Sequence, residues 1–257
     1  MSRHIKILIS AAWLSALLTV ITVADLWSQE EQVKPLGGAV VDPGFGLGAN
    51  FPAGDLSARY GGNLNFSVSP SFITAKNWIL QGDFIYLFGN NVKEDVLAPL
   101  RNSSGLIPGD DGQVADVFLR ERGLYIGLGG GRLFPLRSGN KSGIKAVISG
   151  GILQHGIRFV DERNSIPQLR AGRSKGYDRL TRGFALKETL GYKLMTRNGR
   201  MNFELNFDFI QGFTSEVRAF NFDTGLPTNK SRLDLLFGIR LVWNLPFYLG
   251  SEEVVYY

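Results

Sequence analysis

The sequence predicts an all-β protein, an eight-stranded antiparallel up-and-down transmembrane β-barrel that is preceded by a signal-peptide helix. Three observations predict this class: an apolar segment opens the chain, apolar and polar residues then alternate with a period of two, and short connections alternate with long ones. The predicted organisation is a signal peptide over residues 1–28, an outer-membrane barrel over residues 29–243, and a short periplasmic tail over residues 244–257.

The composition narrows the classes further. The 257 residues include no cysteine, which excludes disulfides, thiolate metal sites and catalytic thiols. The net charge of +5 is spread along the chain without a dense run of Lys or Arg, so we expect no nucleic-acid partner. We also expect no cofactor and no metal.

The first residues resemble an export signal. Arg3, His4 and Lys6 form a basic start, and an almost uncharged apolar run follows from Ile7 to Ala24. We expect cleavage after Ser28, with cleavage after Ala24 or a retained membrane helix as alternatives. No later stretch approaches the ~20 apolar residues that a spanning helix needs.

The alternation is longest between Met201 and Phe213, where Phe and Leu dominate one face and Asn, Glu and Asp the other. A membrane-spanning strand needs about 9–11 residues, and this segment is long enough. Seven further segments repeat the pattern: Phe45–Phe51, Tyr60–Phe72, Trp78–Phe88, Leu124–Gly131, Ile144–His155, Arg179–Leu194 and Arg232–Trp243.

The connections between these segments alternate in length. The short ones are residues 74–77, 137–142 and 197–199, where Asn198-Gly199 predicts a tight hairpin. The long ones are residues 52–58, 89–120, 160–177 and 214–231. Outer-membrane barrels place short turns in the periplasm, so an even strand number predicts that both termini are periplasmic.

Two soluble folds are the alternatives. A β-sandwich would have shorter strands with polar faces outward. A lipocalin-like barrel would turn its apolar face inward around a ligand. The polar faces here carry charges of both signs, which suits a paired interior better than either alternative.

Several segments resemble a family of small outer-membrane barrels of the Bacteroidetes group. They are Phe51–Leu56, Gly176–Leu180, Gly183–Leu186 and Arg232–Pro246. More loosely, size and strand number resemble the OmpA transmembrane domain and the PorT/PorG-type barrels of type IX secretion. The resemblance implies fold and location, and it implies little about the role.

The last strand resembles the signal that the barrel-assembly machinery reads during biogenesis. Gly238, Leu241 and Trp243 have the spacing of that signal. Leu236 departs from it, because a polar residue is usual at that position.

Six charged residues fall on the polar faces of the predicted strands. Buried charges must pair, because isolated burial costs several kcal/mol per ion. We therefore expect an ion-pair network that fills the lumen, with a gated path for protons or small solutes as the alternative. The six residues are Asp83, Lys187, Glu204, Asp208, Asp234 and Arg240.

A catalytic role is not expected. The chain after the signal has one histidine, His155, and the sequence identifies no group to orient it as a general base. A lipid-modifying enzyme that uses His155 is the rival hypothesis from the enzyme class.

Two surface features suggest partners. The basic loop residues Arg163, Arg170, Arg173 and Lys175 suit lipopolysaccharide phosphates, and an ordinary solvated loop is the alternative. Glu188 falls among apolar residues on the lipid face, so either a bulge shifts the register there or a protein partner covers it.

The sequence thus predicts a non-enzymatic outer-membrane barrel that is a structural or accessory component of an assembly or secretion complex. A narrow gated pore is the rival hypothesis from the transport class. The expected partners are outer-membrane lipid, lipopolysaccharide, the barrel-assembly machinery and proteins of an outer-membrane complex.

Overall fold

The computed structural model describes residues 38–136, 141–170, 172–195, 202–227 and 230–249. These residues belong to one compact unit, Leu36–Tyr257. The predicted signal peptide and the last eight residues of the predicted tail lie outside the described residues.

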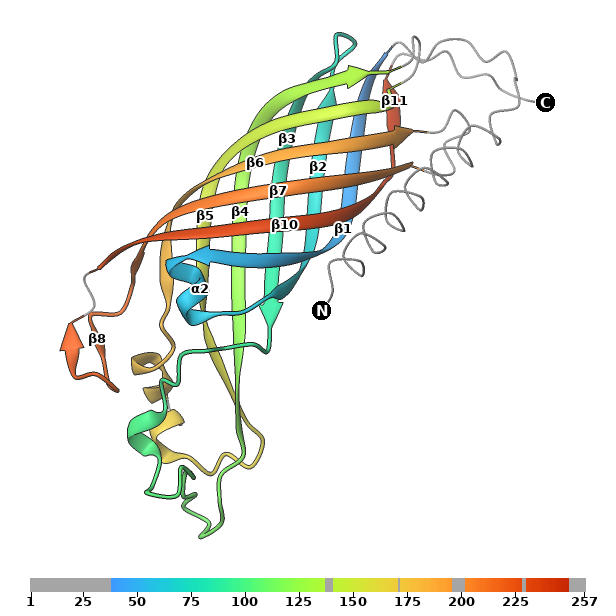
Figure 1. Ribbon diagram of the computed structural model, residues 1–257. Helices are drawn as coiled ribbons and strands as arrows, with labels where there is room; N and C mark the ends of the chain where they lie inside the picture. The colour runs from blue at the N-terminus through green and yellow to red at the C-terminus, as the bar shows by residue number, and fades with distance from the viewer. Residues whose placement is uncertain (1–37, 137–140, 171, 196–201, 228–229, 250–257) are drawn as a thin grey trace, which may run out of the picture. The chain divides into compact units, whose positions relative to one another are not determined.

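Eight long strands form a closed antiparallel barrel (Figure 1). Each strand pairs with the next along the chain, and β1 closes the ring by pairing with β10 from Gly44 opposite Asn244 to Gly54 opposite Asp234. This confirms the eight-stranded antiparallel barrel of the predicted fold class. The strands are β1 Ala39–Gly54, β2 Asn63–Ile73, β3 Trp78–Gly89, β4 Val117–Pro135, β5 Gly143–Asp161, β6 Thr181–Met195, β7 Asn202–Glu216 and β10 Ser231–Asn244.

Smaller elements occupy the connections. The long connections hold the helix α2 Asp55–Arg59, the 3-10 helices η1 Ala98–Leu100, η2 Pro167–Leu169 and η3 Arg173–Gly176, and a short hairpin of β8 Phe220–Asn221 and β9 Leu226–Pro227. Figure 1 shows α2 and β8 toward one end of the barrel and β11 at the other. None of the described helices has the length and apolar character to cross a bilayer.

The predicted boundary between barrel and tail shifts. After β10, the strand β11 Phe247–Leu249 pairs with β1 at Ala39–Val41. The first residues of the predicted tail therefore extend the barrel sheet to Leu249, because β1 begins earlier than predicted and offers a free edge there.

Alternation sorts side chains between the two faces of the wall. Leu128 and Ile148 are 72% and 65% exposed on the outside, whereas Lys187 and Asp234 are fully buried inside. An apolar outside around a polar inside is the arrangement of a membrane-spanning barrel.

The strand ends that alternation predicts differ in places from those in the structure. Tyr60 was expected on the outer face of the second strand, but β2 begins at Asn63 and Tyr60 is fully buried. Residues 52–58 were expected to be a loop, but β1 continues to Gly54, whose φ of +57° ends the strand, and α2 follows. The strands β4 and β5 also extend beyond prediction, to Val117 and Asp161.

Glycines on β1 make room inside the barrel. A Cβ atom at Gly48 would lie 2.6 Å from the carbonyl oxygen of Ile239 and 3.1 Å from Cβ of Arg240. A Cβ atom at Gly46 would lie 3.2 Å from Cγ of Arg240. The bare backbone of β1 therefore provides the space in which the stem of Arg240 lies.

Candidate functional site: a filled lumen and a closed mouth

The middle of the lumen holds a charge-balanced network. Arg240 donates from Nε and Nη2 to the carboxylate of Asp208, at 2.8 and 3.1 Å. Lys187 lies 2.8 Å from Asp83 and 3.9 Å from Asp208, and all four side chains are buried. Two cations therefore face two carboxylates, which is how buried charge is tolerated. Hydroxyls complete the shell, with Ser67 and Ser69 accepting from Arg240 at 3.0 Å and Thr189 donating to Asp208 at 2.6 Å.

A second network lies toward the end of the barrel that carries the short turns. Glu204 accepts from Lys145 at 2.7 Å and from Lys193 at 2.6 Å. Lys193 also pairs with Asp42, and Asn244 bridges Glu204 and Asp42 at 2.7 and 3.1 Å. Of these residues the sequence singled out only Glu204.

A third network lies toward the long connections and contains the histidine. Nε2 of His155 lies 2.8 Å from Oδ2 of Asp234, and Thr214 donates to the same oxygen at 2.5 Å. Arg232 lies 3.1 Å from Oδ1 of Asp234. The ring of Tyr60 packs edge-on against His155 with centroids 5.6 Å apart.

Asp234 is thus an orienting partner for His155 that the sequence did not reveal. A His–Asp pair can position a base, but the hydroxyl of Thr214 donates to Asp234 and not to His155. His155 is also buried inside the barrel, with its side chain turned away from the lipid face. This geometry gives a lipid substrate no route to the imidazole through the wall.

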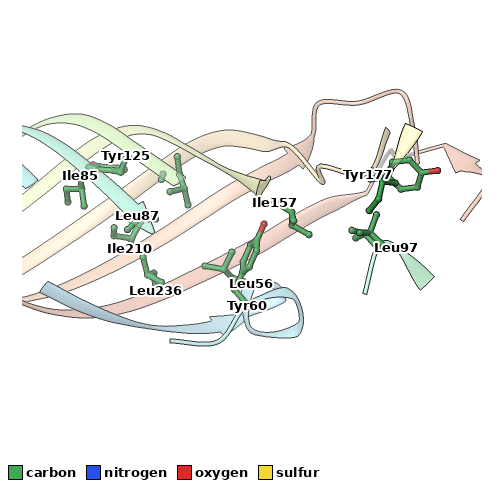
Figure 2. Close-up of a cluster of buried hydrophobic side chains, with 14 of the residues drawn as sticks. Leu56, Tyr60, Ile85, Leu87, Leu97, Tyr125, Ile157, Tyr177, Ile210 and Leu236 are labelled. Atoms are coloured by element: carbon green, nitrogen blue, oxygen red, sulfur yellow. The ribbon is translucent and has the colours of Figure 1, made fainter. Parts of the chain in front are cut away.

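Apolar side chains separate the polar networks. Along β7 the inward positions run from Asp208 through Ile210 to Thr214, and along β10 from Arg240 through Leu236 to Asp234. Figure 2 shows Ile85, Leu87, Tyr125, Ile210 and Leu236 as part of one buried cluster. Leu236, the departure from the assembly signal, therefore has a packing role inside the barrel.

The mouth at the long connections is closed by two buried arginines. Arg59 donates to Glu94 at 2.8 Å and to Glu216 at 2.7 Å. Arg179 donates to Glu94 at 2.7 Å and makes a two-point contact with Asp223, at 2.8 and 2.5 Å. These contacts join all four long connections, or strand ends next to them, across the barrel opening.

The charges at the mouth stabilise one another. Burial acts to lower the pKa of Arg59, but the neighbouring carboxylates of Glu94 and Glu216 help to hold it above its ordinary value. Burial acts to raise the pKa of Glu94, but Arg59 and Arg179 hold it below its ordinary value. The cluster therefore stays charged and paired at neutral pH.

The buried apolar cluster of the barrel continues into the long connections. Val96 and Leu97 are fully buried, and Ile107 and Ile166 are nearly so. Figure 2 shows Leu97 near Tyr177, beyond the barrel strands. These connections therefore pack into a folded cover above the mouth.

The four basic residues of the predicted lipopolysaccharide contact divide into two pairs. Arg170 makes a two-point contact with Asp110, at 2.6 and 3.0 Å, and Arg163 lies 3.3 Å from Asp111. Arg173 and Lys175 are exposed at η3, and no described carboxylate pairs with them.

Glu188 is exposed on the outer wall, as alternation predicts. The register of β6 continues unbroken past it, with Ile148 opposite on β5 and Phe209 opposite on β7. No bulge relieves its position. Its polar contact is Gln211, whose amide donates to it at a long 3.3 Å.

The six predicted lumen residues all lie inside the barrel, but in three networks and not one. Asp83, Lys187, Asp208 and Arg240 share the middle network, while Glu204 and Asp234 belong to the others. Among the residues that sequence reasoning missed, Lys145 and Lys193 already stood on polar faces of the alternation. Arg59 also stood on a polar face of the alternation, at the start of the second predicted strand, but the structure places it at the end of α2.

The comparisons with known proteins return distant structural likenesses. No protein-family model matches the chain, and no curated protein is significantly similar to it. The chain is similar in structure to Ail, the attachment invasion locus protein of Yersinia pestis, at 10% identity and a TM-score of 0.44, covering 82% of this chain and 99% of that one. Neisserial surface protein A gives 10% identity, a TM-score of 0.42 and the same coverage. The outer-membrane protein OprG from Pseudomonas aeruginosa gives 12% identity and a TM-score of 0.36, covering 82% and 97%.

Among the described residues, no cluster of His, Asp and Glu has the arrangement of a metal site. The candidate site of this chain is therefore the set of three lumen networks and the arginine cluster at the mouth. Chemically, these groups hold charge in place by pairing it.

Proposed function

We propose that this chain is a closed, non-enzymatic barrel of the outer membrane that serves as a structural or accessory component of an outer-membrane assembly or secretion complex. The apolar outer wall supports a membrane location, and a polar interior is typical of outer-membrane barrels. We place the long connections outside the cell and both termini in the periplasm, because outer-membrane barrels keep their short turns on that side.

The filled lumen carries the proposal. A solute would have to pass the Arg59–Arg179 cluster at the mouth, three ion-pair networks, and the apolar side chains between them. An eight-stranded barrel is just wide enough for its own side chains to fill it. Separating even one buried pair leaves an uncompensated charge, which costs about 3–5 kcal/mol. Side chains that block the lumen at several depths favour a structural role over the passage of solutes.

Glu188 supports the accessory role. It lies on the outer wall among Phe207, Phe209 and Leu190, with one long hydrogen bond from Gln211. A carboxylate that faces lipid there is unfavourable. A protein partner that places a donor or cation against Glu188 removes that cost.

Site-specific photo-crosslinking in native membranes tests the accessory role. A photoreactive residue at position 188 is compared with one at Ile126, which is 52% exposed on β4, away from Glu188. We expect a protein adduct from position 188 and lipid adducts from position 126. A chain that purifies alone, with no protein adduct at position 188, would contradict the accessory role.

Two rival functions have their own tests. The charged lumen is the feature that a narrow gated pore would use, and steady conductance in a planar bilayer would favour that function.

A lipid-modifying enzyme would use His155, and His155→Ala would then change lipid A composition. We expect no such change, because His155 points into the closed lumen.

A further inference from the structure

Four arginines stand together on the outer wall of β4, β5 and β6. Arg120 and Arg158 are directly opposite each other on β4 and β5, and both are exposed. Arg122 follows on the same face of β4, opposite Gly156. Arg182 lies on β6, opposite Gln154 of β5, and donates to its amide oxygen at 2.8 Å.

These four arginines lack the carboxylates that most other described arginines have. Arg59, Arg101, Arg163, Arg170, Arg179, Arg218, Arg232 and Arg240 each pair with Asp or Glu. No described carboxylate lies within ion-pair distance of Arg120, Arg122, Arg158 or Arg182. The hydrogen bonds of the group go to neutral acceptors, such as the 2.7 Å bond from Arg122 to the carbonyl oxygen of Glu121, and the buried carboxylate of Glu121 acts on Arg122 only at longer range.

The arrangement is unfavourable for the barrel alone. Like charges directly opposite on neighbouring strands repel, as Arg120 and Arg158 do. The outer wall at this level therefore concentrates four positive charges that form no ion pair with a described carboxylate. An anion against these side chains would relieve the repulsion.

The position of the cluster indicates what kind of anion fits. Directly below it on the outer face begin the apolar side chains of the wall, including Ile126 and Phe184. Beside Arg120 and Arg122 lies a groove of about 500 Å³. Its lining also includes the apolar side chains of Phe51, Leu64 and Phe88. Positive charge at the edge of an apolar surface fits a molecule with an anionic headgroup and an apolar tail.

We propose that Arg120, Arg122, Arg158 and Arg182 bind phosphate groups of a phosphorylated glycolipid in the membrane leaflet next to the long connections. One guanidinium group can donate two parallel hydrogen bonds to the oxygens of a phosphate. Several guanidinium groups can bind the same phosphorylated headgroup. The lipid's acyl chains lie against the apolar wall below. The identity of the leaflet rests on the proposed orientation, and the phosphate recognition does not.

The wall cluster is a better candidate for anion binding than the paired arginines of the loop. Arg163 and Arg170, which the sequence suggested, already hold Asp111 and Asp110. The wall arginines make no such contact. A protein that met the membrane through this cluster would have a preferred depth and rotation in the bilayer.

Native mass spectrometry of the purified full chain tests the proposal. The probe is a bis-phosphorylated glycolipid of lipid A type, compared with the same lipid after removal of its phosphates. We expect Arg120→Gln with Arg158→Gln to weaken binding of the phosphorylated lipid by about tenfold or more, as the loss of charge-assisted contacts implies. Binding of the dephosphorylated lipid should not change.

The matched control is Arg132→Gln on the same strand. Arg132 stands at the opposite end of β4, where its guanidinium lies 5.3 Å from the ring centroid of Trp78. Equal binding by wild type and the double variant, or an equal loss in the control, would overturn the proposal. Displacement of the lipid by an equal concentration of inorganic phosphate would overturn the assignment to a lipid. None of these outcomes depends on conductance or on a protein partner.

Discussion

Removing Arg240 tests whether the lumen networks stabilise the barrel by pairing charge. Arg240 is 1% exposed and donates four hydrogen bonds, two to Asp208 and one each to Ser67 and Ser69. The variant Arg240→Met keeps much of the side-chain volume and removes the charge. Asp208 then retains Thr189 at 2.6 Å and Lys187 at 3.9 Å.

The expected cost follows from the charge that is left behind. The middle network changes from two cations and two carboxylates to one cation and two carboxylates. Breaking a buried pair in this way costs about 3–5 kcal/mol, because the remaining ion is uncompensated. Because Asp208 keeps the hydrogen bond from Thr189, we expect the loss of folding stability to lie toward the lower end of that range.

The assay is equilibrium unfolding by urea in detergent micelles, read as the free energy of unfolding. The double variant Arg240→Met with Asp208→Leu removes both charges and should be more stable than Arg240→Met alone by about 2 kcal/mol or more. The control Lys175→Met, on an exposed loop, should change stability by less than about 0.5 kcal/mol. The reasoning would be refuted if Arg240→Met cost less than about 1 kcal/mol, or if the double variant were the less stable of the two.

Three further outcomes are expected. Gly48→Val should lower the free energy of unfolding by about 1–3 kcal/mol through overpacking. In the control Gly150→Ala, the added Cβ atom would meet only the ring edge of Phe184 at 3.5 Å, so this variant should lose much less stability. Equal losses in the two variants would contradict the packing argument. Arg59→Ala should open the mouth and speed proteolysis within residues 90–116, and an unchanged cleavage rate would show that the cluster does not hold the cover. Because the pKa of Glu94 in the folded state lies below its ordinary 4.5, its stabilisation is complete above pH 4.5 and is lost as the pH falls through the depressed value. Protection from an acid-active protease should therefore persist at about pH 5 and fall below about pH 4, and Glu94→Gln should remove that dependence.

Alternation allowed each face of the wall to be predicted residue by residue. Lys187 and Glu188 are neighbours in sequence, and the period of two placed the first inside and the second outside, as the structure has them. The prediction held because each spanning strand buries one face in lipid and the other in the lumen. A shift of one residue would have exposed every charge to lipid.

Partners within the lumen could not be predicted in the same way. Lys145 and Glu204 are 59 residues apart in sequence, and their contact depends on the stagger between strands around the ring. The same holds for His155 and Asp234, which are 79 residues apart. Sequence alternation gives the face of a residue but not its height along the axis.

The closed mouth was missed for a different reason. Arg59 was expected on the polar face of the second predicted strand, yet it lies at the end of α2 and reaches Glu216, 157 residues further along. Irregular connections have no period from which a contact can be inferred. Their packing is set by tertiary contacts such as those of Leu97 and Ile166.

Planar-bilayer recording of the purified full chain tests the central claim most directly. Because the lumen is blocked at several depths, we predict no steady conductance from the wild type or from Asp83→Ala, which disturbs the middle network alone. A steady conductance from the wild type that increases in Asp83→Ala would contradict the filled lumen and identify a pore.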